Sequence, residues 1–433
     1  MRIETLTKES RQALLQLLEA RNPASYTEQQ AAVDEIIAAV RTKGDRAVFD
    51  YEQRFDHAVL TPETIRVNRE EIDAAYDELD PEFIAVMRRA AANIRDYHEK
   101  QKVNSWISTK PDGSILGQRV TPLASSGCYV PGGRAAYPSS VLMNIIPAKV
   151  AGVEHIICCT PPNAEGRIVP GTLAAADIAG VDEIYKVGGA QAIAAMAYGT
   201  ETIPKVDKIT GPGNIYVALA KKACFGITGI DSVAGPSEIL VIADETANPR
   251  FIAADLLSQA EHDPLASAIL LTTSRPFAEA VSAEIDGFLK TLERAEIIRQ
   301  SLDNYGYAFV GETMDDLIDA ANAIASEHME IVTGNPFEVM TKVHNAGAIF
   351  LGSYSSEPLG DYYAGPNHIL PTNGTARFFS PLGVDQFIKR TSIISYSREA
   401  LEKVHGDIEL FARNEGLTAH ANSISVRFDG VSG

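Results

Sequence analysis

Two segments of the chain combine histidine with an amide or acid side chain, a pairing that can hold a metal ion or transfer a proton. Gln259 and His262 are three residues apart near the end of a predicted helix at 249–261, so both side chains can lie on one helical face. Neutral imidazole is a common zinc ligand, whereas a carboxamide is an unusual one. The alternative is an exposed helix end, where a histidine is favoured by the helix dipole.

The second segment is the adjacent pair Glu327 and His328, which follows a predicted helix at 313–326. Neighbouring residues inside a helix do not face each other, but both side chains can reach one cleft where the helix ends. Glutamate and histidine form a natural pair for proton transfer at neutral pH. Further acids and histidines lie in a loop-rich segment and in the tail, and their positions alone do not select them: Asp361, His368, Glu415 and His420.

Three glycine-rich segments are candidates for binding an anion. They are GCYVPGG (127–133), VGGAQ (187–191) and TGPGNIY (210–216). The last one precedes a predicted helix at 214–225, whose first N–H groups could face a phosphate. However, no segment matches the complete dinucleotide fingerprint, Pro212 lacks an N–H group, and no P-loop lysine follows. Tight turns without a ligand are equally consistent with the pattern.

The cysteines give a weaker indication of chemistry. Cys158 and Cys159 lie in the apolar run HIICCT, which is typical of a buried strand, and burial raises the pKa of a thiol. Cys128, beside a glycine-rich turn, is the more exposed candidate for a nucleophile. Four cysteines without a CxxC spacing predict neither a disulfide framework nor a zinc–thiolate site, and they fit a reducing compartment.

An α/β fold is predicted to position these residues. Short β-branched runs alternate with alanine-rich helical stretches, which indicates parallel strands joined by helical crossovers. Strands are expected at 126–130, 155–160, 183–188 and 207–210, and in a second series at 238–243, 268–272, 307–310 and 346–351. We therefore expect two successive parallel-sheet α/β domains of an incomplete Rossmann-like type, with small helical elements at the N- and C-termini.

The composition excludes several classes of protein. The chain has 433 residues, of which 45% are hydrophobic and 22% charged, so it can bury a core and is not disordered. Its net charge of −19 argues against nucleic acid as a partner, because phosphate-backbone binding needs a basic surface. The N-terminus MRIETLTKES lacks the features of a secretory signal, and polar residues interrupt the most apolar stretch. We expect a cytoplasmic protein that does not bind a membrane.

Taken together, these segments resemble those of the histidinol dehydrogenase family. The resemblance covers essentially the whole chain, and its segments occur in the family's order. They are GCYVPGGRAAYPSSVLMN, VGGAQAIAA, ITGPGNIYV, AGPSEIL, LLSQAEHD, SEHMEI, DYYAGPNHILPT and EGLTAHANS. Any one of them is weak, whereas the ordered set is specific.

The resemblance implies an activity and a site. It implies an NAD-dependent, zinc-containing oxidoreductase that converts L-histidinol through histidinal to L-histidine with two NAD+, the last steps of histidine biosynthesis. It implies one zinc ion per active site and a homodimer with shared sites. The implied zinc ligands are Gln259, His262, Asp361 and His420, the last donated by the other subunit. The implied catalytic pair is His328 as general base and Glu327 as activator of water.

The resemblance also implies which residues contact the small molecules. The substrate contacts are Ser237, Gln259, His262, His328, Asp361, His368, Glu415 and His420. The NAD contacts are Tyr129, Gln191 and Asn214. It further suggests a nested division of the chain. The parts are an N-terminal helical arm at 1–25 that is available to a partner, a first α/β domain at 26–104 with 237–382, a second α/β domain at 105–236, and a helical tail at 383–433.

Three rival interpretations remain open from the sequence. A zinc-dependent hydrolase would use the same metal donors and a glutamate base to activate water. A non-catalytic α/β binding protein would use the glycine turns only structurally. A thiol-dependent aldehyde dehydrogenase would require a reactive Cys128.

Overall fold

The structure is a computed structural model that describes residues 1–21, 26–132 and 137–429. Contacts divide the chain into a large unit, Met1–Lys102 with Leu123–Phe387, and a smaller unit, Val103–Pro122 with Ile388–Gly433. Parts of the predicted arm (22–25), of the first glycine-rich segment (133–136) and of the tail (430–433) lie outside the described residues.

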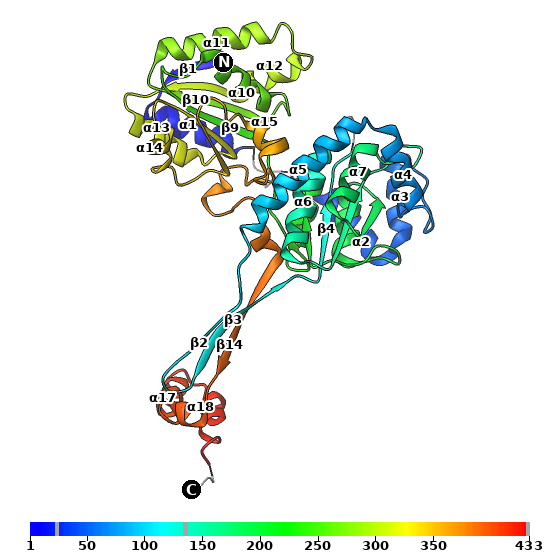
Figure 1. The fold of residues 1–433 in the computed structure, drawn as a ribbon, viewed down its shortest axis with the longest axis vertical. Helices are drawn as coiled ribbons and strands as arrows, with labels where there is room; N and C mark the ends of the chain where they lie inside the picture. Colours follow the sequence, from blue (N-terminus) through cyan, green and yellow to red (C-terminus); the bar gives the residue numbers. More distant parts are fainter. Residues whose placement is uncertain (22–25, 133–136, 430–433) are drawn as a thin grey trace. The chain divides into compact units, whose positions relative to one another are not determined.

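The first sheet of the large unit has six parallel strands in the order β1-β11-β10-β9-β12-β13 (Figure 1). In this order the strands are Arg2–Thr5, Gly306–Val310, Ser267–Thr272, Glu238–Ala243, His328–Val332 and Ala348–Leu351. The helices with it are α1 Lys8–Glu19, α10 Pro249–Ala260, α11 Arg275–Phe288, α12 Ala295–Tyr305, α13 Met314–Ile324, α14 Pro336–Met340 and α15 Glu357–Leu359. Helical turns follow at Gly360–Ala364, Thr375–Arg377 and Val384–Phe387.

Helices cover both faces of this sheet, as its uniformly apolar strands require. Strand β9 (EILVIA) shows the alternation: Ile239 and Val241 pack among residues of α10, α11 and α12, whereas Leu240 and Ile242 pack among residues of α1 and α13. Figure 1 shows α11 and α12 on one side of the sheet and α1, α13 and α14 on the other.

The N-terminal segment belongs to this sheet. Residues Arg2–Thr5 form the edge strand β1, which pairs with β11, and Leu14 and Leu18 of α1 are buried in the core. The expectation of a purely helical arm at 1–25, available to a partner, is therefore wrong for the described residues. A four-residue edge strand is too short to give a clear alternation in the sequence.

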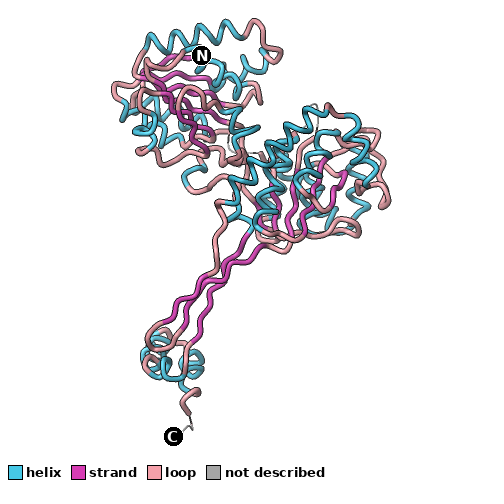
Figure 2. The backbone as a smooth tube through the Cα atoms, in the orientation of Figure 1, coloured by secondary structure: helices cyan, strands magenta, loops and turns pink. Residues whose placement is uncertain are grey.

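The second sheet of the large unit has five parallel strands in the order β6-β5-β4-β7-β8. In this order the strands are Glu183–Lys186, His155–Thr160, Ser125–Tyr129, Lys208–Thr210 and Gly229–Ile230. The helices around it are α2 Thr27–Lys43, α3 Asp45–Phe55, α4 Arg69–Glu78, α5 Pro81–Glu99, α6 Pro138–Ala151, α7 Pro170–Ala179, α8 Gly189–Tyr198 and α9 Ile215–Cys224. Figure 2 shows the strands of both sheets between layers of helices.

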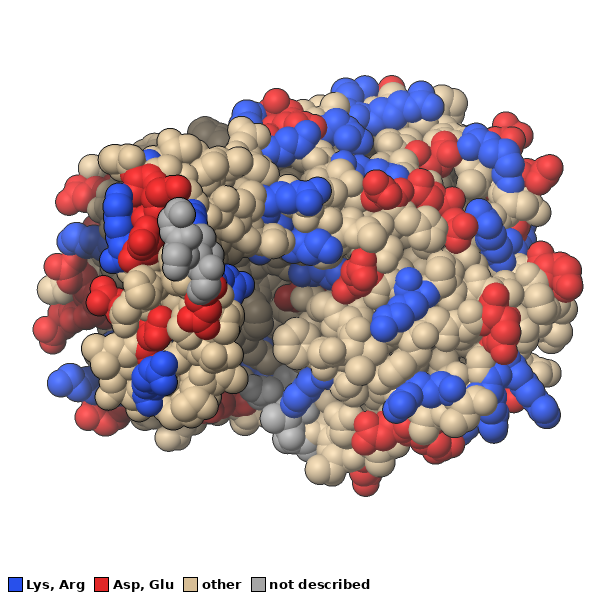
Figure 3. All heavy atoms as spheres, turned by 90° about the horizontal axis from the view of Figure 1, so that it is seen from below, with Lys and Arg blue, Asp and Glu red and all other residues tan. Residues whose placement is uncertain are grey.

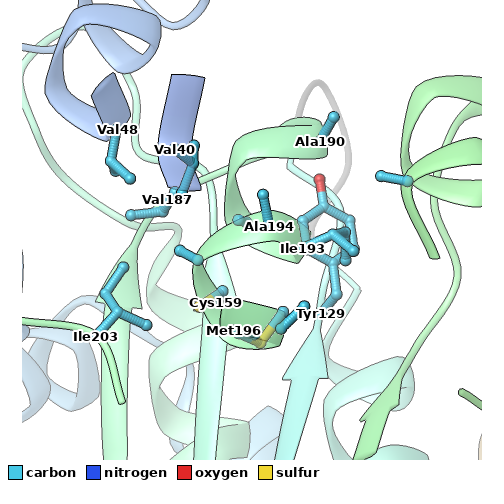
Figure 4. Packing of buried hydrophobic residues seen from close by; sticks show 14 of the residues in the cluster. Val40, Val48, Tyr129, Cys159, Val187, Ala190, Ile193, Ala194, Met196 and Ile203 are labelled. Carbon is cyan, nitrogen blue, oxygen red and sulfur yellow. The ribbon is translucent and has the colours of Figure 1, made fainter. Parts of the chain in front are cut away.

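One core of this sheet is built from segments far apart in the sequence. In Figure 4, Val40 and Val48 from α2 and α3 lie beside Val187, and Ile193 of α8 lies beside Tyr129 at the end of β4; all belong to one buried cluster. The opposite face buries α5, α6 and α7. Residues 27–99 therefore pack on the five-stranded sheet, not on the six-stranded sheet with which the sequence division grouped them. The boundaries of independent folding domains stay a proposal.

The smaller unit is a three-stranded antiparallel sheet with three helices. The strands lie in the order β14-β3-β2, with bounds Ile388–Ser395, Ile115–Pro122 and Trp106–Thr109. The helices are α16 Arg398–Glu402, α17 His405–Asn414 and α18 Thr418–Ser425. Residues 105–122 thus pair with the tail, and the tail is not wholly helical as expected. The eight-residue register between β3 and β14 joins segments that no local pattern connects.

The predicted fold class is confirmed: the large unit contains two α/β sheets, each built of parallel strands, and the smaller unit carries the C-terminal helices. Among the described residues, no helix combines the length and apolarity needed to span a bilayer. On the face seen in Figure 3, acidic and basic side chains are interspersed.

Candidate active site

A cavity of about 480 Å³ in the large unit collects most of the predicted site residues. They reach it from the ends of strands and helices that are distant in the sequence. The predicted residues that line it are Asn214, Ser237, Gln259, His262, Glu327, His328, Asp361 and His368. Ser237 directly precedes β9, and Glu327 and His328 stand at the start of the parallel neighbour β12, so these three residues meet at the amino edge of the six-stranded sheet.

Helix α10 supplies the first two of these residues. The helix begins at Pro249 after the capping side chain of Asn248, and it ends at Ala260. Gln259 therefore lies in the last turn, and His262 follows directly, with its N–H bonded to the Gln259 carbonyl at 3.2 Å. Gln259 is 1% exposed, and its Oε1 has no hydrogen-bond partner among the described residues. A buried acceptor without a partner is costly unless a ligand satisfies it.

A strained turn places the glutamate–histidine pair. Helix α13 ends at Ile324, the capping residue Ala325 has a left-handed backbone (φ 56°), and the chain then enters β12 at His328. His328 is therefore the first residue of a strand and not part of a helix end. The neighbouring strand β9 holds both side chains, because Glu238 N donates to Glu327 Oε2 at 2.9 Å and the Glu238 carbonyl lies 3.1 Å from His328 Nδ1.

The contact with the Glu238 carbonyl sets the tautomer of neutral His328. A carbonyl oxygen only accepts, so Nδ1 carries the proton and Nε2 is the free acceptor. His328 is 4% exposed, and its Nε2 has no hydrogen-bond partner among the described residues. The ring thus presents a basic nitrogen toward the cavity, where Asp361 Oδ1 lies 3.8 Å away.

Asp361 lies in the helical turn Gly360–Ala364, between two histidines. His368 Nδ1 is 3.0 Å from the Asp361 carbonyl, and Ser140 Oγ is 3.3 Å from His368 Nε2. Burial acts to raise the pKa of Asp361, but His328 and His368 outweigh it and lower the pKa to about 2. Asp361 is therefore ionised and suited to hold a cation.

One acid of the site was missed by the sequence analysis. Glu357 is 2% exposed, its Oε1 lies 4.0 Å from His328 Nε2, and it forms with His328 and Asp361 a group whose candidate ligand atoms all lie within 4.8 Å of one another. Burial raises the pKa of Glu357 to about 8. No local pattern singles it out, because its place beside His328 depends on how the chain returns after β13.

The pKa values of the pair reflect this concentration of acids. Burial raises the pKa of Glu327 to about 7, against the opposing effect of His328. Burial lowers the pKa of His328, but the charges of Glu327, Asp361 and Glu357 outweigh it and raise the pKa to about 10. The chain alone therefore keeps a proton on His328, and additional positive charge in the cavity would favour the neutral ring.

The donor set fits a zinc ion. Gln259 contributes an unpartnered carboxamide oxygen, His262 an imidazole and Asp361 an ionised carboxylate, and all three line the same cavity. Burial lowers the pKa of His262, which favours the neutral, metal-binding form of the ring. The fourth predicted ligand, His420, lies on α18 of the smaller unit, and the predicted substrate contact Glu415 caps α17 there; both side chains are exposed.

The predicted NAD contacts line a second, larger cavity of about 1020 Å³ at the carboxyl edge of the five-stranded sheet. Tyr129, Gln191 and Asn214 all contribute to it, and Asn214 also lines the first cavity. The side chain of Asn214 caps α9 through Tyr216 N and Val217 N. Gly211 before it has φ 120°, and a Cβ there would lie 2.0 Å from the Tyr129 carbonyl, so only glycine fits.

The structure does not support Cys128 as an exposed nucleophile. Cys128 is 1% exposed at the end of β4, and burial raises the pKa of its thiol. The expectation that it is the more exposed cysteine is wrong, because β4 is the central strand of its sheet and Cys128 packs in a core cluster with residues of α6 and α7. All four cysteines are free and buried.

Comparisons with known proteins identify the family and the fold of the chain. A model of the family described as histidinol dehydrogenase matches residues 19–428. The histidinol dehydrogenase of Halalkalibacterium halodurans is 58% identical over 401 residues, 93% of this chain and 94% of that protein. That of Bacillus subtilis is 54% identical over 427 residues, 99% of both chains. A crystal structure of histidinol dehydrogenase from Elizabethkingia anophelis superposes with a TM-score of 0.94 at 39% identity and covers 100% of this chain and 99% of its own.

Proposed function

The chain belongs to the histidinol dehydrogenase family, and from this premise we infer how its site oxidises L-histidinol through histidinal to L-histidine. Conversion of an alcohol to an acid removes four electrons, so two NAD+ are consumed and a water molecule must be added between the two hydride transfers. The observation that carries the assignment is the convergence of Glu327, His328 and the metal donors in one cavity.

We assign zinc to Gln259, His262 and Asp361, with His420 from a second copy of the chain as the fourth ligand. When bound, the ion would hold the imidazole and amine of the substrate and offset the negative charge of Asp361, which favours the neutral form of His328. The unpartnered Gln259 Oε1 supports this assignment, because no residue in the described part of the chain satisfies it.

His328 acts as the general base in both oxidation steps. Its Nδ1 is held by the Glu238 carbonyl, so Nε2 is free to take the alcohol proton as hydride leaves for the first NAD+. The same nitrogen takes a proton from the hydrated aldehyde in the second step. Burial of the ring excludes bulk water, which protects the reactive aldehyde between the steps.

Glu327 activates the water that hydrates histidinal. Its pKa of about 7 lies near the working pH, where a carboxyl group exchanges a proton most effectively. The hydrogen bond from Glu238 N fixes one carboxyl oxygen and leaves the other available. Substrate contacts are proposed for Ser237, His368 and Glu415, and NAD contacts for Tyr129, Gln191 and Asn214.

A homodimer with shared sites is proposed because large apolar side chains of the smaller unit are exposed and would be covered by a second copy of the chain. Large apolar side chains of this unit face solvent in the single chain: Trp106, Ile107, Ile394, Leu410 and Phe411 are each 52–73% exposed. A second copy would cover this surface and bring His420 and Glu415 to the metal donors. A cytoplasmic location is proposed from the biosynthetic role and the free cysteines.

Absorbance of reduced nicotinamide, measured with L-histidinol and NAD+, tests the activity. We expect two NADH for each L-histidinol consumed, and loss of turnover after chelation with recovery on adding zinc. A zinc-dependent hydrolase would produce no NADH, and a stoichiometry of one would mean that the second oxidation takes place elsewhere.

A further inference from the structure

Glu52 is a fully buried carboxylic acid that plays no part in the chemistry described above. It lies on α3, and its side chain reaches the turn at the start of α8. There Oε1 accepts hydrogen bonds from Gly188 N at 3.0 Å and from Gln191 Nε2 at 2.8 Å. Burial of a carboxyl group costs desolvation free energy unless the group is hydrogen-bonded. These two hydrogen bonds offset part of that cost.

The two contacts determine which end of the Gln191 amide is bonded and which end is left free. A backbone N–H can only donate, so the Oε1 that receives the Gly188 N–H is an acceptor whether or not Glu52 carries a proton on Oε2. The same Oε1 therefore binds the NH₂ group of Gln191 and excludes its oxygen. Gln191 Oε1 is buried and has no partner among the described residues, although Gln191 lines the 1020 Å³ cavity.

The rest of the turn holds this orientation. Gly189 N donates to the Tyr129 hydroxyl at 3.0 Å, which ties the turn to β4. Gly189 has φ 59°, and a Cβ at this position would lie 2.7 Å from Gln191 Oε1. The turn is thus held by Glu52 and by Tyr129, and it packs closely around a single free acceptor.

We propose that Glu52 is a positioning residue for the cofactor: it fixes Gln191 so that its carboxamide oxygen accepts a hydrogen bond from a hydroxyl or amino group of NAD. Glu52 acts through Gln191 and does not touch the cofactor. This proposal rests on the proposed function, since it takes NAD as the occupant of the cavity.

Kinetics of Glu52→Met test this role. Methionine keeps the length of the side chain and removes both oxygens, so the amide of Gln191 is free to turn. We expect KM for NAD+ to rise about tenfold, which corresponds to one lost hydrogen bond, while kcat and KM for L-histidinol change less than about twofold. Glu52→Gln retains an acceptor oxygen and should restore the KM of the wild type.

Two controls separate positioning from general destabilisation. Asp50→Ala removes an exposed carboxylate from the same helix and should leave KM for NAD+ unchanged. In a Gln191→Ala background, Glu52→Met should raise KM for NAD+ by a smaller factor than it does alone, because both substitutions remove the same interaction. If Glu52→Met does not fold, Glu52→Asp, which withdraws the oxygens by one methylene, should raise KM for NAD+ in its place.

The outcomes distinguish the two hypotheses. Unchanged KM for NAD+ in Glu52→Met with an active wild type would overturn the role of Glu52, as would additive effects with Gln191→Ala. Absence of turnover in the wild-type enzyme would instead overturn the proposed function.

Discussion

At the residue scale, the proposed mechanism depends on which nitrogen of His328 is free. The Glu238 carbonyl occupies Nδ1, and this leaves Nε2 as the base in the cavity. We expect His328→Asn to lower kcat by about 10²- to 10⁴-fold, the usual contribution of a general base, while zinc remains bound. Steady-state kinetics and metal analysis of the same preparation measure both quantities. Undiminished kcat would remove His328 from the base role.

A second prediction at this scale concerns the dependence of stability on pH. Burial raises the pKa of Glu52 to about 8, whereas the unfolded value is about 4.3. The folded state therefore binds the extra proton, and the contribution of Glu52 to stability is full below about pH 4 and is lost as the pH rises toward 8. Glu52→Gln cannot ionise. The difference in free energy of unfolding, Glu52→Gln minus wild type, should therefore increase by at least about 1.4 kcal/mol when the pH is raised from 5 to 8.5.

Urea denaturation of the wild type and of Glu52→Gln at several pH values measures this difference. Subtraction of the two profiles removes the contributions of groups that do not interact with Glu52, so the difference reports Glu52 together with its neighbour Asp56. A constant difference across the range would show that the carboxyl of Glu52 titrates normally in the folded protein.

At the scale of elements, the start of β9 connects the N-terminal segment to the catalytic pair. Arg21, at the end of α1, is 3% exposed and pairs with Glu238 at 2.6 Å, and it also donates to the Leu265 carbonyl at 2.7 Å. Glu238 in turn holds Glu327 and His328 through its backbone. The N-terminal segment thus stabilises the strand that orients the base.

Removal of one partner of this buried pair should be costly. We expect Arg21→Met to lower the free energy of unfolding by roughly 3 kcal/mol, because Glu238 is left buried without its counter-charge. Adding Glu238→Gln should recover part of the loss, since the unpaired charge disappears. Chemical denaturation of both single variants and the double variant measures the coupling, and simple additivity would show that the pair does not interact in solution.

At the scale of the whole molecule, the proposed metal donors are divided between the two units of the chain. His262 belongs to the large unit and His420 to the smaller one. If the site is shared between subunits, a mixed dimer of His262→Ala and His420→Ala contains one intact site. Random mixing makes half of the dimers mixed, so activity should return to about a quarter of the wild-type value.

A mixture of His262→Ala and Gln259→Ala provides the matched control. Both substitutions damage the same part of the site, so no mixed dimer is intact and no activity should return. Recovery of activity in this control mixture would contradict a site shared through the tail. Absence of activity in verified mixed dimers of His262→Ala and His420→Ala would contradict it as well.

The sequence predicts the two parallel sheets because the alternation of β-branched and alanine-rich runs can be recognised from residues that are neighbours in the chain. It also indicates Gln259 and His262, which share one helix end, and Glu327 with His328. It does not indicate Glu357 or Glu52, because their roles come from burial against elements far along the chain. The pairing of β3 with β14 and the packing of residues 27–99 on the five-stranded sheet were missed for the same reason.

The proposed mechanism requires that the metal is held by Gln259, His262 and Asp361. The structure offers a competing set, since His328, Glu357 and Asp361 also lie close enough together to hold an ion. Anomalous diffraction at the zinc edge from crystals of the enzyme with L-histidinol distinguishes the two. We expect one peak per chain within about 2.0–2.2 Å of Gln259 Oε1, a nitrogen of His262 and an oxygen of Asp361. A peak bonded to His328 and Glu357 would contradict it, because the base would then be a ligand.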